Sequence, residues 1–136
     1  MFLNKNINFN IVLCGFMGCG KTSVGKQLSL QTGLNFIDTD CYIEKKCGLA
    51  VSEIFKTYGE MYFRNLEKNC IKTVSHAPDT IISTGGGMVL DKENILCLKQ
   101  NGKIFYLDAS VDIITSRLIS DSTRPLIKNK NSIKKL

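Results

Sequence analysis

The stretch Gly15-Phe16-Met17-Gly18-Cys19-Gly20-Lys21-Thr22 fits the pattern GxxxxGK[ST] at every fixed position and carries a further glycine, Gly18, inside it. Glycines remove the Cβ atoms that keep a phosphate away from the main chain, so successive N–H groups can point inward at it. In such a loop the lysine reaches the β- and γ-phosphates and the threonine hydroxyl can bind Mg²⁺. The stretch therefore predicts a phosphate-binding loop, and a glycine-rich turn that matches by chance is the alternative.

The residues on either side favour the phosphate-binding interpretation. Asn8 to Cys14 reads as a short strand, and Thr22 to Leu30 reads as a helix that ends at Gly33. Strand, glycine loop and helix follow in the required order, and the helix N-terminus adds the positive end of a dipole. The residues expected to bind a nucleoside triphosphate here are Gly15, Gly18, Cys19, Gly20, Lys21, Thr22 and Ser23.

Composition limits the class of protein. A chain of 136 residues is one domain, residues 1–136, and is short for a nucleotide-binding α/β domain with all its strands. A net charge of +6 suits anionic ligands, but no aromatic residues alternate with the charges as a nucleic-acid groove requires. The six cysteines include no CxxC pair, which argues against metal or disulfide roles and fits a reducing cytosol. With no apolar run of membrane-spanning length, we expect a cytoplasmic monomer that binds neither nucleic acid nor membrane.

A second expected strand, Leu34 to Asp38, runs into Thr39 and Asp40. Side chains two apart on an extended segment point the same way, so the carboxylates of Asp38 and Asp40 are expected to project together. Ligand sites of an open parallel sheet lie along one edge, which places the pair beside the phosphate loop. One acid can hold Mg²⁺ or its water, and the other can accept a proton from an attacking hydroxyl. A turn with a helix N-cap is the alternative; beside the loop, we favour chemistry.

Three helices are expected next. Asp40 to Lys46 can form the first, closed by Gly48, and Ser52 can cap the second, which Gly59 interrupts. In the third, apolar side chains recur three and four apart between Glu60 and Val74, which is typical of a helix with one buried stripe.

Arg64 and Glu67 lie three apart on this third helix and so share a neighbouring face. By spacing alone, the favoured interpretation is a surface salt bridge worth at most about 1 kcal/mol. His76, the single histidine, precedes Pro78 in an expected loop and is given no role.

The third expected strand, Asp79 to Thr84, runs into Gly85-Gly86-Gly87. Three consecutive glycines cost backbone entropy, which is easiest to justify where a ligand presses close to the main chain; a flexible turn is the alternative. Asp91 can then cap a helix through Gln100, closed by Gly102, and Lys103 to Asp108 can form a fourth strand.

The last segments are expected to carry two arginines. Ser110 can cap a helix to about Ile119 that contains Arg117, and the polar segment 121–126 holds Arg124 followed by a rigid proline. Such a segment suits a mobile lid that brings an arginine over the phosphates, although an exposed arginine is usually only solvated.

Taken together, the chain resembles shikimate kinase, a small relative of the nucleoside monophosphate kinases, from Ile11 to Leu126. The elements that carry the resemblance, in order, are the loop Gly15 to Thr22, Asp38-Thr39-Asp40, Phe63-Arg64-Asn65-Leu66-Glu67, Gly85-Gly86-Gly87 and Arg124-Pro125-Leu126.

The resemblance implies a three-layer α/β/α fold of the P-loop NTPase type with a parallel sheet, a substrate-binding helical segment at about 40–75 and a lid at about 120–127. It also implies ATP- and Mg²⁺-dependent phosphorylation of the 3-hydroxyl of shikimate, giving shikimate 3-phosphate and ADP in the pathway to chorismate and the aromatic amino acids. Members of the family continue past the lid with a further helix, a second carboxylate-binding arginine and a fifth strand. Here no arginine follows Arg124 and four strands are counted, so the final strand and helix are expected to be absent.

Roles for single residues also follow from the resemblance. On the acceptor side, Asp40 would contact the hydroxyls as the candidate base, Arg64 would hold the carboxylate, and Glu67 would orient that side of the pocket. The residues that would line the acceptor with main chain are Gly85, Gly86 and Gly87.

On the nucleotide side, Asp38 and Thr22 would lie near the metal, Arg117 would lie along the base, and Arg124 would close over both substrates as a catalytic residue with Lys21. Two other readings remain: another small P-loop kinase acting on gluconate or a nucleotide, and a truncated nucleotide-binding remnant without turnover.

Overall fold

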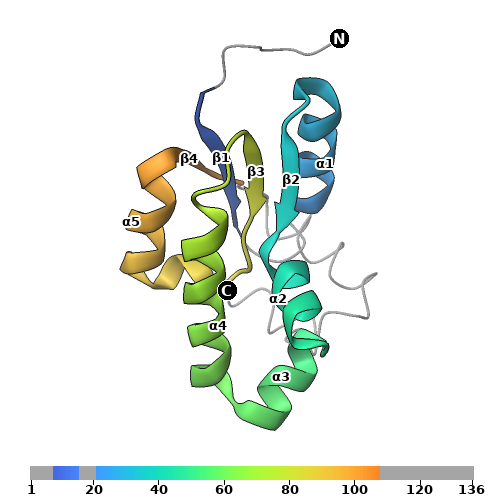
Figure 1. Ribbon diagram of the computed structural model, residues 1–136, viewed down its shortest axis with the longest axis vertical. Helices are drawn as coiled ribbons and strands as arrows, with labels where there is room; N and C mark the ends of the chain where they lie inside the picture. Colours follow the sequence, from blue (N-terminus) through green and yellow to red (C-terminus); the bar gives the residue numbers. More distant parts are fainter. Residues whose placement is uncertain (1–7, 16–20, 108–136) are drawn as a thin grey trace, which may run out of the picture.

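The computed structural model describes residues 8–15 and 21–107, which form a parallel sheet with helices on both of its faces (Figure 1). The strands are β1 (Asn10–Cys14), β2 (Asn35–Asp38), β3 (Thr80–Ser83) and β4 (Gly102–Tyr106), in the spatial order β2-β3-β1-β4. The helices are α1 (Lys21–Thr32), α2 (Thr39–Cys47), α3 (Val51–Tyr58), α4 (Glu60–Val74), the 3₁₀ turn η1 (Met88–Leu90) and α5 (Lys92–Asn101). The expected α/β class with a parallel sheet is therefore confirmed.

Alternation along the strands separates two cores. Val12 pairs with Ile82 and Ile104, and all three contribute to the larger core beneath α2 to α5. Ile11 and Ile81 point the opposite way, into the smaller core that faces α1. Figure 1 shows α1 on one side of the strands and α4 with α5 on the other, which is the expected three-layer arrangement.

The parallel pairing determines where ligand-binding residues gather. Strands β1, β2 and β3 run in the same direction, so the loops after them leave one edge of the sheet. Because β3 lies between β1 and β2, the glycine turn at 85–87 emerges between Gly15, which follows β1, and the Asp38–Asp40 segment, which follows β2. Two stretches separated by more than forty residues in the sequence thus become neighbours.

Close packing explains one glycine inside a helix. Gly25 is buried in α1, and a Cβ added there would collide with the ring of Phe36 on β2. The absence of a side chain lets α1 approach the sheet, which outweighs the cost of about 1 kcal/mol that a glycine imposes on a helix interior.

Most predicted helix boundaries are confirmed. Gly48 ends α2 in the left-handed region at φ 71°, and its N–H donates to Glu44 O at 2.8 Å. Asp91 caps α5 by accepting from Glu93 N at 2.9 Å. The prediction that Ser52 caps α3 is wrong: α3 begins at Val51, whose N–H is satisfied by the Glu44 carboxylate at 2.8 Å, seven residues earlier in the chain.

Some predictions concern segments that the structure does not describe. The helix from Ser110 and the lid at 120–127 lie there, as does the end of the strand predicted to reach Asp108, whose described part stops at Tyr106. Across residues 8–15 and 21–107, no helix has the length and apolar character to cross a membrane.

Candidate active site

The phosphate-loop region begins where the central strand β1 ends. Gly15 follows this strand with φ 146°, a backbone conformation that favours glycine, and α1 begins at Lys21. The Lys21 Nζ donates to Gly15 O at 2.6 Å. Thr22 and Ser23 complete a first turn that holds no acidic side chain, so the positive end of the α1 dipole is not neutralised within it. The other predicted loop residues, Gly18, Cys19 and Gly20, lie outside the described ranges.

The two aspartates do not lie on one extended segment, so that part of the prediction is wrong. Asp38 is the last residue of β2 and the N-cap of α2, and its Oδ1 accepts from Cys41 N at 3.1 Å. Asp40 lies in the first turn of α2. The N-cap alternative is thus correct for Asp38. The two carboxylates nevertheless remain close enough for the charge of Asp38 to raise the pKa of Asp40.

Asp40 has the properties of a group prepared for proton transfer. Burial, and then the charges of Asp38 and Glu67, raise its pKa to about 6, and Lys21 opposes them. Its Oδ1 is buried and has no hydrogen-bond partner among the described residues. This oxygen lies against the Cα of Gly85, since a Cβ built on Gly85 would be 2.7 Å from it. A buried acceptor without a partner is costly, and a donor from a bound hydroxyl would satisfy it.

Arg64 and Glu67 form a buried ion pair and not the expected surface salt bridge. Arg64 Nη1 donates to Glu67 Oε1 at 2.7 Å, and the Glu67 side chain is only 1% exposed. Burial raises the pKa of Glu67, and the hydrogen bond from Arg64 opposes this shift. The guanidinium also lies over the rings of Phe55 and Phe63, at 5.9 and 5.6 Å from their centroids. Arg64 is therefore held in place while 35% of its side chain stays open.

The glycine turn packs against both of these groups. A Cβ on Gly87 would meet the Arg64 guanidinium at 2.6 Å, whereas one on Gly86 would meet nothing within 4 Å. With Asp40 against Gly85, the first and third glycines each give space to a charged side chain from another element. The turn thus brings Asp40 and Arg64, which the chain separates by 24 residues, to one stretch of main chain.

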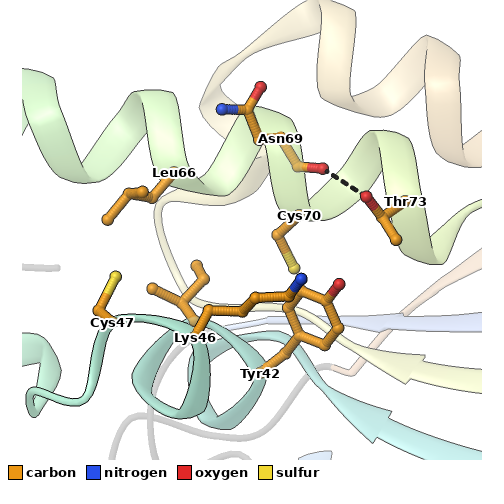
Figure 2. Close-up of a pocket in the computed structure, with 8 residues that line it drawn as sticks. Tyr42, Lys46, Cys47, Leu66, Asn69, Cys70 and Thr73 are labelled. Atoms are coloured by element: carbon orange, nitrogen blue, oxygen red, sulfur yellow. Dashed lines mark hydrogen bonds between the residues drawn. The ribbon is translucent and has the colours of Figure 1, made fainter.

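A hollow of about 140 Å³ between α2 and α4 lies outside this group, because none of the predicted site residues lines it (Figure 2). Its walls include Tyr42, Lys46 and Cys47 from α2, and Leu66, Cys70 and Thr73 from α4. Figure 2 shows the Cys70 side chain directed toward α2. Its thiol donates to Thr39 O at 4.0 Å, so the hollow adjoins the helix start that carries Asp40.

Metal-binding and thiol predictions are tested only over the described ranges. Residues 8–15 and 21–107 contain no cluster of three or more His, Cys, Asp and Glu side chains that could hold a metal. Among the described residues, Cys41, Cys47, Cys70 and Cys97 form no disulfide. Arg117 and Arg124 lie beyond residue 107, so their predicted roles have no described geometry. Sequence reasoning also missed Thr39, which is fully buried and accepts from Gly85 N.

The sheet order, the strand–loop–helix unit and the clustered acid and arginine side chains define a P-loop kinase fold. The sequence model of the shikimate kinase family matches residues 17–136. The chain belongs to the shikimate kinase family.

Relatives and solved structures agree with this assignment. The shikimate kinase of Caldicellulosiruptor saccharolyticus is 46% identical over 124 residues, which cover 91% of this chain and 72% of that one. That of Thermodesulfovibrio yellowstonii is 48% identical over 122 residues, covering 90% and 70%. The structure of shikimate kinase from Acinetobacter baumannii in complex with shikimate superposes with a TM-score of 0.88 at 36% identity, covering 96% and 73%.

A gluconokinase from Sinorhizobium meliloti superposes less well. Its TM-score is 0.55 at 13% identity, covering 93% of this chain and 71% of that one. This likeness is one of fold alone.

Proposed function

We propose that this protein transfers the γ-phosphoryl group of ATP to the 3-hydroxyl of shikimate, giving shikimate 3-phosphate and ADP. Family membership supports the reaction. The observation that carries it to particular residues is the convergence of Asp40 and Arg64 on the glycine turn, at the same edge of the sheet as Lys21. A small polyol acid needs both a group for its hydroxyl and a cation for its carboxylate.

On the donor side, the start of α1 holds the triphosphate. Lys21 leaves its contact with Gly15 O and binds the β- and γ-phosphates, as the lysine of this motif does. Gly15, Thr22 and Ser23 contribute amides and hydroxyls at the positive end of the helix. Thr22 and the Asp38 carboxylate would hold Mg²⁺, which supplies charge neutralisation at the phosphate oxygens when bound.

On the acceptor side, Arg64 binds the carboxylate of shikimate. The planar guanidinium matches a carboxylate with two parallel hydrogen bonds, and the buried Glu67 fixes its orientation. Gly85, Gly86 and Gly87 line the acceptor with main chain. The Oε2 of Glu67, buried and without a partner among the described residues, is available for a hydroxyl donor.

Asp40 orients the attacking hydroxyl and accepts its proton. Its pKa of about 6 leaves the carboxylate ionised at neutral pH and close to the pH at which proton transfer is most efficient. The hydroxyl oxygen attacks the γ-phosphorus in line, the bond to the ADP oxygen breaks, and the proton moves to Asp40. Positioning and charge stabilisation supply most of the rate enhancement, because a loose transition state needs little proton transfer to a base.

The remaining roles belong to segments beyond residue 107. In the proposal Arg117 lies along the nucleotide base, and Arg124 closes over both substrates with the lid at about 120–127. One P-loop kinase domain at 1–136, with its substrate-binding segment at about 40–75, carries all of these groups.

The test is ADP formation with ATP and Mg²⁺ against a panel of acceptors: shikimate, its methyl ester, gluconate and nucleoside monophosphates. We expect turnover with shikimate, and poor turnover with the ester, because esterification removes the charge that Arg64 binds. Preference for gluconate or a nucleotide would contradict the proposal. Shikimate binding by calorimetry without any ADP formation would favour a remnant that no longer turns over.

A further inference from the structure

Thr39 lies at the junction of the elements that form the acceptor site. It is the first residue of α2, between the capping Asp38 and the half-buried Asp40, and it is 0% exposed. Its Oγ1 accepts a hydrogen bond from Gly85 N at 3.2 Å. Gly85 is also the residue whose Cα lies beneath the Asp40 carboxylate. One hydrogen bond thus joins the start of α2 to the turn at the point where Asp40 touches it.

The main chain of Thr39 is held from a second direction. Its carbonyl oxygen accepts from the Cys70 thiol at 4.0 Å, a weak hydrogen bond of the kind sulfur makes. Cys70 is buried and lies three residues after Glu67 on α4. Burial raises the pKa of Cys70 to about 12, so the thiol keeps the proton that it donates. The helix that carries Arg64 and Glu67 is therefore also tied to Thr39.

We propose that Thr39 is a positioning residue for phosphoryl transfer, whose hydroxyl holds the glycine turn against the start of α2, and thus beside Asp40, at the spacing that the acceptor requires. Its carbonyl oxygen keeps α4 joined to the same point. This inference rests on the proposed function, because it assumes that Asp40 and Arg64 bind one acceptor. A threonine needed only to fill space could be replaced by valine, which has nearly the same shape. Valine, however, would leave the Gly85 N–H without its acceptor.

The test compares Thr39→Val with Thr39→Ser. We expect Thr39→Val to raise the KM for shikimate about tenfold and to lower kcat, as the loss of one hydrogen bond in the site would. The KM for ATP should stay within about twofold, since the hydrogen bonds of Thr39 run to the acceptor-side residues Gly85 and Cys70. Thr39→Ser keeps the hydroxyl and should restore both constants. Thermal unfolding of each variant shows whether the fold is retained.

Two kinetic outcomes would overturn the inference. One is a folded Thr39→Val variant with the wild-type KM for shikimate. The other is equal damage in the valine and serine variants, because serine keeps the hydroxyl, which would then not be sufficient to hold the site.

Hydrogen exchange at the Gly85 amide, followed by NMR, gives an answer that does not depend on turnover. The inference predicts slow exchange in the wild type and in Thr39→Ser, and faster exchange in Thr39→Val. Rapid exchange of the Gly85 amide in the wild type would overturn the inference. This result needs no variant, so it holds even if the Thr39→Val protein does not fold. If the wild type fails to phosphorylate shikimate, the proposed function is wrong, and the Gly85 amide still decides whether Thr39 holds the turn.

Discussion

The Arg64 guanidinium and the Glu67 carboxylate meet at 2.7 Å, yet their surroundings differ sharply: Glu67 is 1% exposed and Arg64 35%. A buried carboxylate of this kind is costly alone, and its partner repays the cost only with good geometry. The pair therefore orients a cation toward the site more than it stabilises the fold. Arg64 Nη2 lies 3.7 Å from the exposed Glu60 Oε2, and in the proposed function an acceptor carboxylate would take the place of this long contact.

Replacement of Glu67 should weaken acceptor binding and leave nucleotide binding intact. Glu67→Gln keeps the volume but removes the charge that orients Arg64, so we expect the KM for shikimate to rise about tenfold, with the KM for ATP unchanged. Arg64→Ala should also destabilise the fold, by up to about 3–5 kcal/mol, because it leaves the Glu67 carboxylate buried without a cation. Steady-state kinetics and urea unfolding measure the two effects, and an unchanged shikimate KM in Glu67→Gln would contradict the assigned role.

A methyl group at Gly87 should displace Arg64. The added Cβ would lie 2.6 Å from the guanidinium, which is the flexible end of a side chain and can move aside. We therefore expect Gly87→Ala to strain the Arg64–Glu67 pair and to raise the KM for shikimate severalfold. Gly86→Ala is the matched control, because the same methyl there meets nothing within 4 Å, and its loss should be smaller. Equal losses in the two variants would indicate that Arg64 is not the group affected.

The pH profile should report Asp40. Its pKa is raised to about 6, first by burial and then by neighbouring carboxylates. In the proposed mechanism Asp40 must be ionised to accept the proton of the hydroxyl. We expect kcat/KM to fall about tenfold per pH unit below about 6 and to level off above it. In Asp40→Asn, the kcat/KM that remains should no longer fall in this way below about pH 6. A profile that stays flat down to pH 5 in the wild type would contradict the assignment of Asp40.

The raised pKa of Asp40 should also make the free energy of unfolding depend on pH. Because the folded pKa of Asp40 lies above its unfolded value of about 3.8, the folded state binds more protons between the two values. Its contribution to stability is present below the unfolded pKa and is lost as the pH rises through about 6. Asp40→Asn should therefore stabilise the protein at pH 7, by at most about 3 kcal/mol in the free energy of unfolding. Denaturant unfolding at pH 5 and pH 7 measures this, and a destabilised asparagine variant at pH 7 would contradict it.

Contact between α1 and β2 should depend on Gly25. Gly25→Ala would push α1 away from Phe36, at a cost of about 1–3 kcal/mol in the free energy of unfolding. The double variant Gly25→Ala with Phe36→Leu should recover part of that loss, because the smaller side chain makes room for the methyl group. If the two losses simply add, the collision with Phe36 is not their cause.

Local pattern was sufficient for most of the fold. The motif from Gly15 to Thr22 predicted its strand and helix, because the pattern specifies backbone conformation over a few residues. Gly48 and Asp91 predicted helix ends for the same reason. Ser52 failed as a cap because its competitor, Glu44, reaches Val51 N from the preceding helix, a contact that depends on how two helices are arranged.

The site was harder to predict wherever burial decided the chemistry. Spacing showed that Arg64 and Glu67 share a face, but not that Glu67 is buried. Its side chain is 1% exposed on a helix that packs against α2, α3 and α5, and spacing does not report such packing. Alternation along a strand placed Asp40 on an extended segment. In the structure α2 begins at Thr39, so Asp40 lies in the first turn of a helix. The importance of Thr39 depends on Gly85, 46 residues later, and no short motif contains both.

The central claim is that Asp40 orients the attacking hydroxyl of shikimate and accepts its proton. Shikimate-dependent ADP formation by the wild type and by Asp40→Asn tests this claim most directly. The account predicts turnover by the wild type and a loss of at least about a hundredfold in kcat in Asp40→Asn, with shikimate binding still detectable by calorimetry. Equal rates in the two proteins, or wild-type ADP formation that ignores shikimate, would contradict it.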